Sequence, residues 1–195
     1  MGRVFNVLFL LQVLAAAGYS EQADVSLTIR TLNDQSVFQI GQAIELELSF
    51  TGTAPNSYRI QLSPALSEVD RVAIEPRSGW DDPLSVFHNS CLTAWEGGLE
   101  SDKVLSFDPT VVVLVLNERM RFKYPGVYRI SVESDRVVRL SSEPGRNGVN
   151  LQSNVLSLSV IPATEQWQQQ TLESAVADLD RPESTRVVSW DRQVA

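Results

Sequence analysis

The chain has 195 residues, of which 43% are hydrophobic and 21% charged, and its net charge is −8. This length and composition fit one globular domain with short appendages, because about 140 residues are enough to bury an adequate core. The acidic balance and the lack of a basic patch exclude a surface built for phosphate backbones, so we expect no nucleic-acid partner.

The first 20 residues have the pattern of a secretory signal peptide. Arg3 makes a short basic segment, residues 4–14 are almost wholly apolar, and small residues lead to a cleavage site after Ala17 or, alternatively, after Ser20. A membrane anchor and a buried strand are the other interpretations, but the apolar run is shorter than the roughly 20 residues that cross a bilayer. We therefore predict a signal peptide over residues 1–20, a secreted or periplasmic protein, and no membrane span after cleavage.

The first strands are predicted from alternation. Residues 24–30 carry apolar side chains at every second position, and residues 44–50 repeat this pattern more strictly. Shorter alternating runs follow at residues 58–62 and 72–74, the second ending before Pro76. Alternating runs separated by turn residues are typical of strands with one face on a core and the other in water.

Residues 76–103 form an irregular stretch that we expect to be ordered. It contains Trp80, Trp95, the single histidine His88 and the single cysteine Cys91, which cannot make an intrachain disulfide. Loops longer than about 12–15 residues are uncommon unless they are functional or disordered. The large apolar side chains argue against disorder, so we expect the stretch to pack on one end of the domain.

The apolar run at residues 111–116 predicts a strand with apolar side chains on both faces. We expect a central strand whose second face is covered by ordinary packing, and a helix or another chain is the alternative cover. Exposed, such a run would be an aggregation hazard. A second strand with strict alternation begins after the corner at Pro125-Gly126.

Pro125-Gly126 is followed at the second position by Tyr128, and this group of residues resembles the corner of bacterial immunoglobulin-like and fibronectin-like sandwiches. In such a corner the tyrosine ring is buried while its hydroxyl bonds the backbone. The last strand is predicted at residues 154–160, and Pro162 ends it.

A helix is predicted after the last strand, with Thr164 as N-cap and Glu165 as its first residue. One apolar stripe at helical spacing contains Trp167, Leu172, Ala175, Val176 and Leu179. A single helical repeat cannot bury its own apolar face. We therefore expect the helix to pack on the strand domain or to stay mobile.

A strand-rich domain followed by one helix resembles exported bacterial proteins in which an immunoglobulin-like module precedes helical repeats. The predicted fold is all-β, an immunoglobulin-like antiparallel β-sandwich over residues 23–162, with a C-terminal α-helix in an extension over residues 163–195. Such a fold does not by itself fix a function.

Catalysis and metal binding have weak support. His88 and Cys91 would need an orienting third group, for which Asp81, Asp82 and Asp102 are candidates, and we favour a buried thiol and a solvated imidazole instead. One histidine and one cysteine are too few for zinc. Calcium could use carboxylates whose spacing matches no calcium loop, namely Asp81, Asp82, Glu100, Asp102 and Asp108. We therefore expect no enzyme, metal or cofactor.

Trp80 and Trp95 are the candidate ligand contacts, because exposed aromatic rings can stack on sugars. We favour the alternative that both rings anchor the irregular stretch on the core. The leading hypothesis is a non-catalytic exported interaction module at the cell envelope, whose partner is an envelope protein or glycan. A carbohydrate-binding accessory module that uses the two tryptophans is the alternative.

Overall fold

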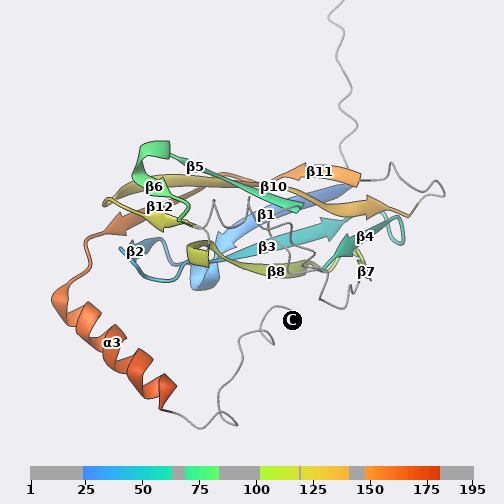
Figure 1. The fold of residues 1–195 in the computed structure, drawn as a ribbon. Coiled ribbons are helices and arrows are strands. Elements are labelled where there is room, and N and C mark those ends of the chain that lie inside the picture. Colours follow the sequence, from blue (N-terminus) through green and yellow to red (C-terminus); the bar gives the residue numbers. More distant parts are fainter. Residues whose placement is uncertain (1–23, 63–68, 84–101, 119, 141–147, 181–195) are drawn as a thin grey trace, which may run out of the picture.

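The fold is described by a computed structural model (Figure 1), in which most of the chain is β-strand and one helix, α3 (Glu165–Leu179), follows the last strand. The structure describes residues 24–62, 69–83, 102–118, 120–140 and 148–180. The expectation of an all-β fold with a C-terminal helix is confirmed over these ranges. Outside them lie the predicted signal peptide, His88, Cys91, Trp95 and Glu100.

The first sheet has three antiparallel strands in the order β1 (Val25–Thr31), β3 (Glu45–Gly52) and β8 (Thr110–Val115). β1 and β3 bury every second side chain, as the alternation predicted. Leu48 of the middle strand is paired with Ile29 on one side and with Val112 on the other. The register therefore places one apolar row across the inner face of the sheet.

The second sheet is organised around β10 (Gly126–Arg139), a strand of 14 residues that is much longer than the alternating run had indicated. Along one side, β10 pairs with β12 (Leu156–Ile161) and then with β11 (Gly148–Gln152). Along the other side, it pairs with β5 (Asp70–Glu75) and then with β4 (Tyr58–Gln61). One long strand thus holds two shorter strands on each side.

Short strands extend this architecture at its margins. β2 (Val37–Gln39) pairs with β12 and β7 (Asp102–Val104) pairs with β4, while β6 (Trp80–Asp81) and β9 (Arg121–Phe122) form a separate pair. The β2–β12 pair is parallel, so the prediction of a purely antiparallel arrangement is wrong there. The parallel direction follows from a pairing between distant segments, which local alternation does not encode.

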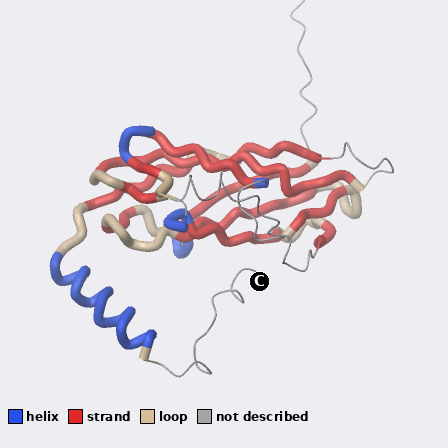
Figure 2. The backbone as a smooth tube through the Cα atoms, in the orientation of Figure 1, coloured by secondary structure: helices blue, strands red, loops and turns tan. Residues whose placement is uncertain are grey.

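The two sheets lie face to face as two layers (Figure 2) and share one core. Leu48 and Phe50 contribute to it from the first sheet, and Ile130 and Val132 from the second, all of them buried. Removing these side chains from water is the main source of stability in a fold of this kind.

The corner before β10 is closed by Tyr128, as the sequence predicted. Its ring is buried and packs edge-on against Phe122, with the ring centroids 4.7 Å apart. Its hydroxyl donates to the carbonyl oxygen of Tyr124 at 2.7 Å, with the carbonyl oxygen of Gly79 at 3.0 Å as a second acceptor. Burial raises the pKa of this hydroxyl. Gly79 is required here, since any Cβ at that position would collide with the tyrosine ring.

β8 lies at the edge of the sheet that the described strands form, so the prediction of a central strand is wrong for this sheet. Among the described strands it pairs with β3 alone. Val112 and Leu114 are buried, while Val111, Val113 and Val115 lie half-buried on the outer face. Apolar residues on both faces are expected of a central strand, but the position of a strand in a sheet depends on its partners rather than on its own pattern.

Helix α3 begins where it was predicted to begin. The side chain of Thr164 accepts a hydrogen bond from the backbone N–H of Trp167 at 3.2 Å. No residue of the helix is buried, and Leu179 is 69% exposed, so the expected packing on the strand domain is not observed. Figure 1 shows the helix projecting away from the two sheets. No helix in the described part of the chain is long and apolar enough to cross a membrane.

Candidate binding face

The outward side chains of the second sheet form rows that cross its strands. Val127 of β10 is paired with Ser159 of β12, which is paired in turn with Val37 of β2. The next row is formed by Ser157, Arg129 and Glu75. Paired residues project to the same face of a sheet. We call this surface the outer face, defined by Val37, Ser159, Val127, Ser157, Arg129 and Glu75.

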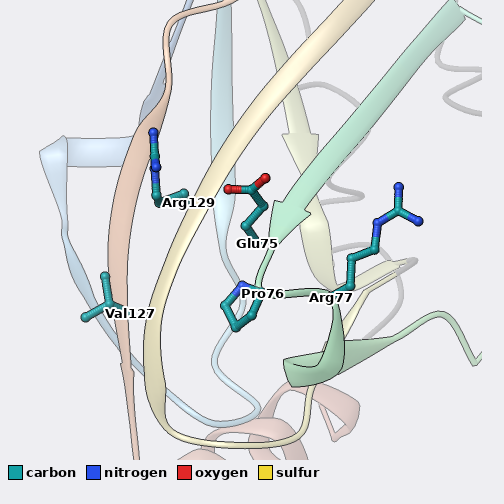
Figure 3. A pocket seen from close by; sticks show the side chains of 5 residues that line it. All are labelled: Glu75, Pro76, Arg77, Val127 and Arg129. Carbon is teal, nitrogen blue, oxygen red and sulfur yellow. The ribbon is translucent and has the colours of Figure 1, made fainter.

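An open hollow of about 540 Å³ lies on this face at the end of β5 (Figure 3). The lining residues are Glu75, Pro76, Arg77, Val127 and Arg129. The chain enters it through the cis Glu75–Pro76 peptide bond and continues into the short 3-10 helix η2 (Arg77–Gly79). In Figure 3 the two arginines stand on opposite sides of Glu75. The hollow therefore combines two guanidinium groups, one carboxylate and two apolar side chains.

The charged groups of the hollow have no ionic partner within the described part of the chain. Arg77, Arg129 and Glu75 take part in none of its ion pairs. These side chains are available to an external ligand, and a free guanidinium group recognises a carboxylate by two parallel hydrogen bonds.

The neighbouring cluster on the same sheet is different, because its charges are already paired. Arg71 lies 2.9 Å from a carboxylate oxygen of Glu133 and 2.9 Å from one of Asp135, and Asn150 donates to both carboxylates. The hydrogen bond from Arg71, followed by that from Asn150, lowers the pKa of Glu133. This cluster stabilises the sheet surface and offers fewer free groups to a ligand.

Trp80 packs on the fold rather than on the outer face. Its ring is half-buried against the core, and its Nε1–H donates to the carbonyl oxygen of Ile74 at 3.2 Å. This geometry fits the packing role that we favoured for Trp80. A contact between Trp80 and a sugar stays a prediction, as does any role of Trp95, which lies outside the described residues.

Two of the acidic residues considered as calcium ligands, Asp81 and Asp102, are held by basic side chains. Both carboxylate oxygens of Asp81 accept from Arg121, at 3.1 and 2.9 Å, and Lys123 lies 3.3 Å away. The hydrogen bond from Arg121 is the main cause that lowers the pKa of Asp81. Asp102 pairs with Arg59 at 3.0 Å. Over the described ranges, no three histidine, cysteine or acidic residues lie together in a way that could hold a metal ion.

The sequence did not single out Glu75, Arg77 or Arg129. Each has a local signal, because Arg129 occupies an outward position of an alternating run and Glu75 directly precedes the proline that ends a strand. What brings them together is the pairing of β5 with β10, which matches Arg129 with Glu75. That pairing joins segments far apart in the chain, so alternation alone could not predict it.

Comparisons with known proteins do not place the chain in a family. No protein-family model matches it, and no curated protein matches it. What supports a function is therefore the arrangement of the described side chains.

Proposed function

We propose that the chain is an exported, non-catalytic interaction module at the cell envelope, with an immunoglobulin-like sandwich fold whose outer face binds a protein partner. The observation that carries this proposal is the hollow on the outer face, where Arg77, Arg129 and Glu75 form no ion pair with any other described residue. The pattern of a signal peptide over residues 1–20 supports export.

The strand arrangement supports an immunoglobulin-like fold. β1, β3 and β8 have the order of the A, B and E strands of such a domain, and β4, β10 and β12 have the order of the C, F and G strands. Tyr128 adds a local feature, because its hydroxyl reaches back to the backbone four positions upstream, as in a tyrosine corner. Sandwiches of this kind commonly present one sheet face to a partner.

The composition of the outer face favours a protein as the partner. Arginine and large apolar or aromatic side chains are enriched in protein interfaces. Val127 is 64% exposed beside the hollow, and Tyr124 is 62% exposed on the adjoining corner. The small side chain of Ser159 lies between the two valines of the row and allows a partner to approach the sheet closely. Sugar stacking would instead need an exposed aromatic platform, and Trp80 does not line this hollow.

The experiment that tests the proposal compares the chain lacking residues 1–20 with an Arg129→Glu variant. Every described element lies after residue 24, so this removal leaves the described fold intact. Both proteins are immobilised and exposed to envelope protein extract. A retained protein is then identified and titrated in purified form. Loss of a charge-assisted hydrogen bond weakens binding on the order of 10- to 100-fold.

The control is Arg30→Glu, which makes the same charge change on the opposite outer face and also removes the ion pair of Arg30 with Glu47. Both variants must keep the cooperative melting of the parent chain. Equal binding by the two variants would place the partner elsewhere and contradict the proposal. Retention of soluble wall polysaccharide without any protein would favour the carbohydrate-binding alternative.

A further inference from the structure

The outer edge of β8 is free along the described chain. The backbone N–H of Leu116 donates to the carbonyl oxygen of Ile44 at 2.9 Å, so alternate residues of β8 direct their backbone groups toward β3. The backbone groups of Val111, Val113 and Val115 consequently point away from it. No described strand other than β3 pairs with β8. An unpaired row of this kind is a template for one more strand.

The side chains of β8 do not discourage such pairing. Natural edge strands are protected by charged residues, proline, bulges or short length. β8 spans six residues, TVVVLV, without a charge or a proline, and its pairing with β3 has no register shift. The short margin strands β2 and β7 contain three residues each. Of the described edges, β8 therefore combines length with an apolar, uncharged sequence.

A second hollow, of about 270 Å³, lies directly beside this edge, where β8 and β5 face each other across the two layers. Its lining includes the apolar side chains of Val72, Trp80, Leu116 and Met120, together with the charged residues Asp70, Arg71 and Asp82. A dry cavity of about 150 Å³ accommodates benzene, so this hollow has room for a large apolar side chain. The free backbone edge of β8 and this largely apolar hollow are thus next to each other.

We propose that β8 receives an extended segment of a partner protein as an added strand. The backbone of that segment pairs with Val111, Val113 and Val115, as in other cases of strand addition. Because side chains alternate along a strand, every second residue of the segment faces the hollow and is expected to be large and apolar. The intervening residues lie along the half-buried valines on the outer side.

Charge further defines the partner segment. Glu45 is paired in register with Val115 on the outer side of the first sheet, and it forms no ion pair within the described part of the chain. A lysine or arginine of the added strand can lay its aliphatic stem over Val115 and bring its charge to Glu45. The proposed ligand is therefore an extended segment that alternates large apolar residues with polar or basic ones. This site is separate from the hollow that carries the proposed function.

The test uses the chain lacking residues 1–20 and a synthetic peptide of about nine residues, the length of a strand, with leucine at every second position and lysine or threonine between. Hydrogen exchange is followed for the amides of Val111, Val113 and Val115. We expect these amides to exchange fast in the free protein and to become slow when the peptide is added. The amides of Val112 and Leu114 should be protected in both states, because they pair with β3.

A pair of N-methylated peptides separates strand pairing from simple apolar adhesion. Methyl groups on the amides that face β8 remove the added hydrogen bonds and should weaken binding on the order of 10- to 100-fold. Methyl groups on the alternate amides, which face away, should leave binding unchanged. Equal binding by both peptides would overturn the proposal, and so would the absence of binding by the unmodified peptide.

A variant of β8 and a control variant of β1 test the same site from the side of the protein. Val113→Lys places a charge at the middle of β8 and should abolish peptide protection, while Thr28→Lys on the outer side of β1 should not. Arg129→Glu should also leave peptide binding unchanged, which separates this site from the outer face. Slow exchange of the three valine amides in the free monomer would overturn the proposal. Slow exchange that appears only with dimerisation would overturn it in favour of a second copy.

Discussion

The two edge strands of the first sheet, β1 and β8, flank the same strand. They differ in whether their outward backbone groups have hydrogen-bond partners among the described residues. At β1, the amide group of Asn154 accepts from the backbone N–H of Ile29 at 2.7 Å and donates to its carbonyl oxygen at 3.1 Å. These two residues are 125 positions apart in the chain. At β8, no described side chain makes an equivalent pair of bonds. Among the described residues, therefore, the β1 edge is closed by a side chain of the other sheet, and the β8 edge has no such bond.

The polar groups near the two edges also differ in charge. Asn154 is a neutral amide, whereas the β8 side contains the ion pair of Arg136 and Asp70, and the Arg136 side chain is only 1% exposed. Nε of Arg136 donates to Asp70 at 2.7 Å, and Ser134 donates to the other carboxylate oxygen at 2.6 Å. Arg136 lies where the β10 register shifts between Ser134 and Val137. The buried ion pair thus links β5 to β10 within the second sheet, and its Asp70 lines the hollow beside β8.

The largest effect is expected from Asp70→Ala. This change leaves a buried guanidinium group without its carboxylate, and breaking a buried ion pair in this way costs about 3–5 kcal/mol. Chemical denaturation measures the free energy of unfolding. Hydrogen exchange should show that β5 loosens before β1.

The control for this change is the double variant Asp70→Ala with Arg136→Met, which removes both charges and should recover most of the lost stability. A loss below about 1 kcal/mol for Asp70→Ala alone would show that the β8 side does not depend on the buried pair.

An intermediate effect is expected from Asn154→Ala. The variant loses both bonds to the backbone of Ile29, which should lower the free energy of unfolding by about 1–2 kcal/mol. Exchange of the Ile29 amide should accelerate, while the β8 amides keep their rates. The matched control is Val155→Ala at the next position, whose side chain is exposed. Equal acceleration in the two variants would mean that Asn154 does not close the β1 edge.

The smallest effect is expected on the pH dependence of stability, through two ion pairs at the surface. Hydrogen bonds from Arg71 lower the pKa of Glu133, and those from Arg121 lower the pKa of Asp81. A lowered folded pKa means that the pair stabilises the fold above the ordinary acid range near pH 4, and that this contribution is lost as pH falls through the folded pKa. Both carboxylates are partly exposed to solvent, so salt should reduce the effect.

Thermal melting between about pH 6 and pH 3 measures this contribution, since that interval spans the ordinary carboxylate range. The Arg121→Gln and Arg71→Gln variants should each show a weaker loss of stability on acidification than the parent chain. Hydrogen exchange of the Ile29 amide should not respond to the protonation of Glu133 or Asp81. The Asn154 side chain that bonds Ile29 is a neutral amide and does not titrate between about pH 6 and pH 3. An unchanged pH dependence in both variants would contradict the prediction.

The sequence by itself determined the elements whose signals are local. Strict alternation predicted β1 and β3, because a half-buried strand must place apolar residues at every second position. Thr164 predicted the start of α3 through a bond that spans three residues. Pro125-Gly126 and Tyr128 predicted the corner and its buried ring, since the hydroxyl bonds the backbone only four positions away.

The tertiary structure alone decided how these elements meet. The edge position of β8, the parallel pairing of β2, and the row that joins Arg129 to Glu75 all follow from contacts between distant segments. The burial of Arg136 and the closing of β1 by Asn154 have the same origin. Periodicity states which face of a strand is apolar, but it does not state which strand lies alongside. The candidate sites are made by those neighbours, so they appeared only with the fold.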